Sequence, residues 1–117
     1  MYSADVAMGL GSLVYALSKL DGPIHPQELH TIKKLLSGEP HGDLALYAYF
    51  IRENTGELSE DAYAFGIRRM AAQQIELTPA TKQRFVNILR RVALAHEGIS
   101  RQERRFIDQF WREINKQ

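Results

Sequence analysis

Four carboxylates occupy matching positions in two short segments of the chain, and they are the side chains best suited to do chemistry. The first segment runs from Asp21 to Glu28, and the second runs from Glu97 to Glu103. Each segment contains an acidic residue, a glycine and an isoleucine before its glutamate. Carboxylate oxygens bind hard divalent cations and basic side chains. The pattern therefore predicts either a shared binding site or two helix caps with their ion pairs.

Structural roles alone would account for part of this pattern. Glu28 and Glu103 fall in the first turns of expected helices, where a carboxylate accepts backbone N–H groups and contributes about 0.5–1 kcal/mol. Asp21 and Glu97 follow helix ends, where negative charge is unfavourable. A neighbouring basic side chain could neutralise them, and Lys19 and Arg101 are the candidates in the sequence. Capping with ion pairing is the favoured interpretation, and a shared cation site stays open beside it.

The donor types limit which cation could bind. In an EF-hand register Glu28 would be the twelfth loop residue, but Leu17 and Lys19 would occupy the first and third ligand positions. This excludes an EF-hand. All-oxygen ligation favours calcium, magnesium or manganese over zinc, unless His25 or His96 joins the ligands.

The sequence contains no motif typical of an enzyme. It has no cysteine, which excludes disulfides and thiolate sites. None of its histidines form an i, i+4 pair, and we expect them to be surface or loop residues. The sequence lacks the Gly-x-Ser-x-Gly motif, a glycine-rich phosphate loop and the His-Glu-x-x-His motif. We therefore expect a non-enzymatic protein.

Arginine doublets define a second candidate surface. The chain has a net charge of +1, but residues 1–58 carry about −3 and residues 59–117 about +4. An acidic protein partner could dock on arginines without any metal. A nucleic-acid partner is not expected, because aromatic and basic residues are not interleaved. The candidate partner-binding residues are Arg90, Arg91, Arg104 and Arg105.

The elements that must position these residues are helical. Apolar residues recur at helical spacing almost throughout, no segment alternates with period two, and about six helices are expected. Pro26 and the N-caps Ser59, Thr78 and Ser100 mark helix starts. Residues 13–36 align with residues 89–111, with a one-residue gap near the glycine. The two helical hairpins would pack most simply about a pseudo-two-fold axis, which would bring both acidic loops to comparable ends of the bundle.

Two details of the expected core depend on this pattern. The third helix is expected to bury the stripe formed by Leu44, Tyr47, Phe50 and Ile51. Trp111 aligns with Leu36 and is expected to pack in the core beside Phe110.

Size and composition suit a single domain. The 117 residues are 44% hydrophobic, enough for one core, and we expect residues 1–117 to form one domain. The longest uncharged stretch, residues 6–18, is too short to span a bilayer, and the N-terminus lacks a signal-peptide pattern. We therefore expect a cytoplasmic protein.

The two acidic segments resemble the paired motifs of the TerB-like domain. The motifs are Ala-x-x-x-Leu-Asp-Gly-x-Ile-x-x-x-Glu at residues 16–28 and Ala-x-x-x-Glu-Gly-Ile-x-x-x-Glu at residues 93–103. The family takes its name from tellurite-resistance proteins and also occurs in some membrane-anchored J-domain co-chaperones. The resemblance implies a bacterial, stress-type module, an all-helical bundle with pseudo-two-fold symmetry, and a divalent-cation or protein-interaction site at Asp21, Glu28, Glu97 and Glu103.

Overall fold

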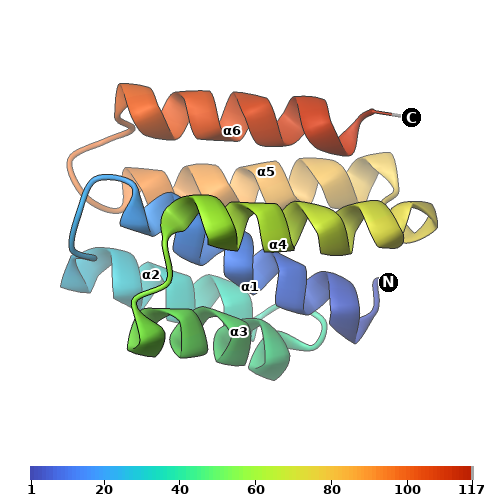
Figure 1. Cartoon of the computed structure of the whole chain (residues 1–117), viewed down its shortest axis with the longest axis horizontal. Helices are drawn as coiled ribbons and strands as arrows, with labels where there is room; N and C mark the ends of the chain where they lie inside the picture. Colours follow the sequence, from blue (N-terminus) through green and yellow to red (C-terminus); the bar gives the residue numbers. More distant parts are fainter. Residues whose placement is uncertain (117) are drawn as a thin grey trace.

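The computed structural model describes residues 1–116, and within that range there is no β-strand (Figure 1). The all-helical prediction is confirmed. Because the apolar stripes have helical spacing, each forms one helix of a bundle around a common core. The helices are α1 (Ala4–Lys19), α2 (Pro26–Ser37), α3 (Gly42–Thr55), α4 (Ser59–Ala72), the 3₁₀ turn η1 (Gln74–Glu76), α5 (Pro79–Leu94) and α6 (Arg101–Ile114).

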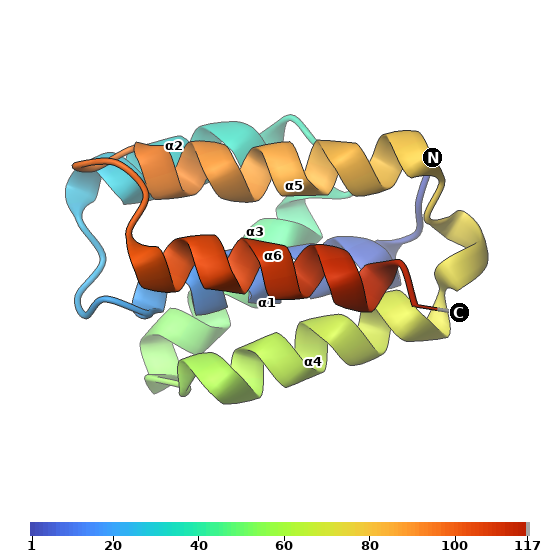
Figure 2. The same cartoon turned by 90° about the horizontal axis from the view of Figure 1, so that it is seen from above.

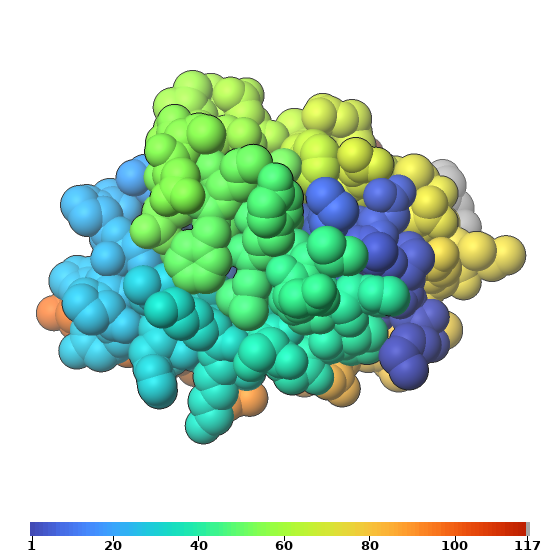
Figure 3. Space-filling model, turned by 90° about the horizontal axis from the view of Figure 1, so that it is seen from below, coloured from blue at the N-terminus to red at the C-terminus, as the bar shows by residue number. Residues whose placement is uncertain are grey.

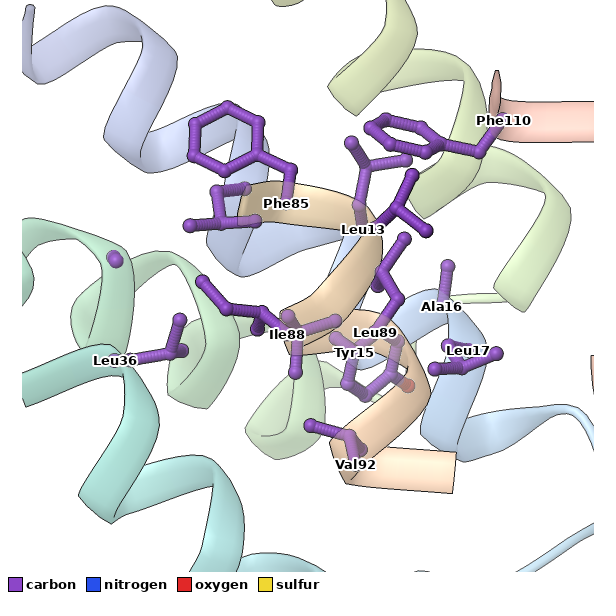
Figure 4. Close-up of a cluster of buried hydrophobic side chains, with 14 of the residues drawn as sticks. Leu13, Tyr15, Ala16, Leu17, Leu36, Phe85, Ile88, Leu89, Val92 and Phe110 are labelled. Carbon is purple, nitrogen blue, oxygen red and sulfur yellow. The ribbon is translucent and has the colours of Figure 1, made fainter. Parts of the chain in front are cut away.

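Helix α1 lies at the centre of the bundle. It is buried continuously from Gly9 to Ser18, as expected for a helix that is apolar on nearly every side. Figure 4 shows Leu13 and Leu17 of α1 near Leu89 of α5 and Phe110 of α6 in the core. Helices α3 and α4 make the most extensive contacts with α1. Figure 3 shows the face formed by α2, α3 and α4, where α1 emerges mainly at its N-terminal end.

Small residues let these helices approach closely. A Cβ atom added to Gly11 would overlap the carbonyl group of Ala45 on α3. A Cβ atom added to Gly66 on α4 would overlap the side chain of Leu13. The backbone of α1 therefore lies almost directly against its two neighbours, and glycine is required at these contacts because a larger residue would separate the helices.

The predicted buried face of α3 is wrong. Tyr47 and Ile51 are 57% and 41% exposed, whereas Ala45, Ala48 and Tyr49 are buried. Because α3 packs closely on Gly11 at Ala45, the face that turns inward carries Ala45, Ala48 and Tyr49. The predicted stripe of large apolar residues therefore lies partly on the surface.

Two further expectations are corrected. The N-cap of α4 is Leu58, and Ser59 is the first helical residue. The Ser59 hydroxyl instead donates a 2.6 Å hydrogen bond to the carbonyl oxygen of Ala16. Trp111 is 41% exposed while Phe110 is fully buried, because adjacent helical residues point about 100° apart and here Phe110 occupies the core-facing side.

The predicted starts of the remaining helices are confirmed, and they define two hairpins. Thr78 and Ser100 are N-caps whose side chains accept backbone N–H groups, and Pro26 is the first residue of α2. The α1–α2 and α5–α6 loops lie at the same end of the bundle, opposite the chain termini (Figures 1 and 2). The hairpins are not equivalent, since α1 is central and α5 has an exposed face. No helix in the described range is both long and apolar enough to cross a membrane.

Candidate functional site

The α1–α2 and α5–α6 loops border one shared cavity of about 500 Å³. Contributions come from the end of α1, both loops and the first turns of α2 and α6. All four carboxylates singled out in the sequence line it: Asp21, Glu28, Glu97 and Glu103. Residues far apart in the chain are thus combined in one concave, acidic surface.

Helix capping fixes the two glutamates. The backbone N–H of His25 donates to Glu28 Oε1 at 3.2 Å, and that of Ser100 donates to Glu103 Oε1 at 2.8 Å. The Ser100 hydroxyl accepts from the backbone N–H of Glu103 at 3.1 Å, which completes a capping box. Both glutamates are buried, with 7% and 6% of their surface exposed. The predicted capping role is therefore present in both hairpins.

Left-handed backbone shapes both loops. Gly22 and Gly98 have φ angles of 108° and 87°, values that glycine adopts at little cost. Glu97 also has a positive φ, 59°, which is uncommon for a residue with a side chain. The loops can therefore turn sharply toward each other.

Negative charge accumulates in the cavity. Burial raises the pKa of the Glu103 carboxyl group, and the charges of Asp21 and Glu28 raise it further, although hydrogen bonds from Ser100 act in the opposite direction. In the described chain no lysine or arginine lies within 4.0 Å of the four carboxylates. The suggested neutralisation by Lys19 or Arg101 is therefore not found among the described residues. The nearest cationic candidate is His96, whose Nε2 atom lies 3.8 Å from Glu97 Oε2.

Two histidines join the loops at this cavity. The rings of His25 and His96 stack with centroids 3.6 Å apart and planes inclined by 25°. Sequence reasoning treated both as surface or loop residues and missed this pairing. The alignment of the two hairpins placed each histidine near a loop, but only the convergence of the loops in space could show that they touch.

The donor atoms do not form a ready-made metal centre. Among residues 1–116, no three or more histidine, aspartate or glutamate side chains are grouped so that they could hold a metal ion. Glu28 and Glu103 are fixed by their caps, whereas Asp21 and Glu97 are exposed. A cation would therefore require the exposed carboxylates to turn into the cavity.

The four candidate arginines are exposed but do not lie together. Arg90 and Arg104 line a small cleft between α5 and α6 that also contains Asp108. Arg91 lines a different groove, between α2 and α5. Arg105 borders neither depression. Consecutive helical residues diverge by about 100°, which explains why each doublet is divided between two faces.

Comparison with known proteins identifies a family. No curated protein and no solved structure gave a significant match to the chain. One family model, described as tellurite resistance protein TerB, matches residues 7–115. This match runs from the second turn of α1 to the end of α6 and includes both acidic loops. The chain therefore belongs to the TerB family, a family of helical domains of the tellurite-resistance type.

Proposed function

We propose that the protein is a non-catalytic module of a bacterial, cytoplasmic stress response and that its paired acidic loops bind a divalent cation. The observation that carries the proposal is the convergence of Asp21, Glu28, Glu97 and Glu103 on one cavity. Membership of a tellurite-resistance family supports the physiological setting. The carboxylates would act as ligands, and no residue would act as a catalyst.

The chemistry of the donors suits a hard cation. Each capping glutamate uses Oε1 to accept a backbone N–H, so Oε2 of each is available as a ligand. Asp21 and Glu97 would complete the ligand set by turning inward. Oxygen donors favour calcium, magnesium or manganese, and recruitment of His25 or His96 would favour zinc. A cation would also relieve the repulsion that raises the pKa of Glu103.

A titration of isotope-labelled protein with each metal chloride tests this proposal. Calcium, magnesium or manganese should perturb amide signals of residues 20–28 and 96–103 together, because both loops contribute ligands. Asp21→Asn and Glu97→Gln should weaken binding by at least about tenfold. Asp43→Asn, which alters an exposed carboxylate on α3, should leave it unchanged. No perturbation at millimolar metal would overturn the proposal.

A second candidate is a metal-independent adaptor that docks an acidic partner through Arg90, Arg91, Arg104 and Arg105. Its support is that all four are exposed and that none lies within 4.0 Å of a carboxylate oxygen in the described residues. An adaptor of this kind would retain its partner after removal of divalent cations with a chelator. Loss of the partner on chelation would favour the cation site.

A further inference from the structure

A wide groove runs between α2 and α5, away from the acidic loops. Its volume is about 700 Å³, and it extends along the C-terminal half of α2 and most of α5. The two helices run side by side in opposite directions (Figures 1 and 2). The groove is lined by Lys34, Leu35, Gly38, Glu39, Ala80, Gln83, Arg84, Asn87, Ile88 and Arg91.

The charges along this groove are almost entirely positive. Helix α5 contains no aspartate or glutamate, and the only carboxylate on α2 is the buried cap Glu28. Lys34 and Arg91 are exposed, and within residues 1–116 no carboxylate oxygen lies within 4.0 Å of either. The one carboxylate in the groove, Glu39, is buried and pairs with Arg84. The free charges that the groove offers a partner are therefore cationic.

Apolar side chains form the floor between these charges. Leu35 is half-buried on α2, and Ile88 is buried on α5. An apolar floor with cationic edges matches the apolar face and flanking charges of an amphipathic helix.

We propose that this groove binds an acidic amphipathic helix of a protein partner, with its apolar face on Leu35 and Ile88 and its carboxylates beside Lys34 and Arg91. A nucleic acid fits less well, because no aromatic side chain lines the groove for bases to stack on. This proposal goes beyond the cation site and does not depend on it. It shares Arg91 with the arginine-rich adaptor surface considered above, but not the cleft of Arg90 and Arg104.

A designed peptide provides the probe. An end-capped helical peptide of about 16 residues is titrated into isotope-labelled protein. It has leucines at i, i+3, i+4 and i+7, glutamates beside this stripe and alanines at the remaining positions. The amide signals of Lys34, Leu35, Asn87 and Ile88 should shift. A peptide whose leucines are replaced by serine should bind at least about tenfold more weakly. Equal binding of both peptides, or no binding at millimolar peptide, would overturn the proposal.

Charge-reversed variants locate the site. Lys34→Glu and Arg91→Glu should each weaken peptide binding by at least about tenfold. Arg68→Glu, with the same change of charge at an exposed site on α4, is the matched control. Equal effects at all three positions would indicate non-specific attraction and overturn the proposal. Displacement of the peptide by single-stranded oligothymidylate of equal charge would also overturn it. If a variant failed to fold, Lys34→Gln and Arg91→Gln would serve the same comparison.

The peptide experiment is separable from the test of the cation site. Asp21→Asn and Glu97→Gln should leave peptide affinity unchanged, since neither residue borders the groove. If peptide binding disappeared in these variants or after chelation of divalent cations, the groove would not be independent of the cation site.

Discussion

The folded protein disfavours the ionised form of the Glu103 side chain relative to water. Burial and the charges of Asp21 and Glu28 raise its pKa, so the folded state binds this proton more tightly than the unfolded state. Stability should therefore fall as the pH rises from the unfolded pKa through the folded pKa. At low pH Glu103 is protonated in both the folded and the unfolded protein, so the cost of burying its charge does not lower the stability.

A neutral isostere tests this penalty. Glu103→Gln keeps an oxygen that can accept the Ser100 N–H but removes the charge. Urea unfolding should show that the variant is more stable than wild type at neutral pH, with the difference disappearing near about pH 4. Glu60→Gln, an exposed glutamate in the first turn of α4, is the control. A stability difference that does not vary with pH would contradict the argument.

Glu39 provides a second prediction at the scale of single residues. Its carboxylate accepts hydrogen bonds from the Tyr2 hydroxyl at 2.8 Å and from Arg84 Nε at 2.8 and 2.9 Å. Glu39→Ala should lower the free energy of unfolding by about 1–3 kcal/mol, because the buried Tyr2 hydroxyl loses its partner. Asp5→Ala breaks a half-exposed pair with Arg69 and should cost less than about 1 kcal/mol. Chemical denaturation measures both values, and equal costs would count against the role of burial.

At the scale of helices, the sequence predicts where a helix starts better than it predicts which face of the helix is buried. Thr78-Pro79 and the Ser100–Glu103 box are local chemistry, which depends on residues within one turn. The buried face of α3 depends instead on which helix it meets. Gly11 admits the backbone of Ala45, and this contact turns Tyr47 outward. A stripe of large apolar residues contains no information about such a close approach.

The same contact provides a prediction for Gly11. An added methyl group would overlap the Ala45 carbonyl, and neither backbone can move without displacing a helix. Gly11→Ala should therefore destabilise the protein by about 1–3 kcal/mol, despite the better helix propensity of alanine. Gly38→Ala is the control, because its added Cβ atom would lie 3.7 Å from the nearest neighbouring atom, the carbonyl oxygen of Leu35. Thermal unfolding should show a lower Tm only for the first variant.

For the whole molecule, the internal repeat was sufficient to predict that the two acidic loops lie at one end. It could not predict how the loops touch. The stacking of His25 on His96 depends on the orientation of one hairpin against the other, and α1 and α5 occupy different depths in the bundle. The candidate carboxylates were therefore found from the sequence, while the aromatic contact beside them required the structure.

That contact predicts an energetic coupling between the hairpins. The two rings lie 3.6 Å apart and belong to loops that are distant in the chain. In a double-mutant cycle, His25→Ala and His96→Ala should couple by about 0.5–1.5 kcal/mol, measured from urea unfolding. His41 is the N-cap of α3, and α3 starts near the end of the bundle opposite the two loops (Figure 1). His41→Ala combined with His96→Ala should therefore be additive within about 0.5 kcal/mol. Additivity in both cycles would mean that the stack contributes nothing to joining the hairpins, and that the loops converge through the packing of the helices alone.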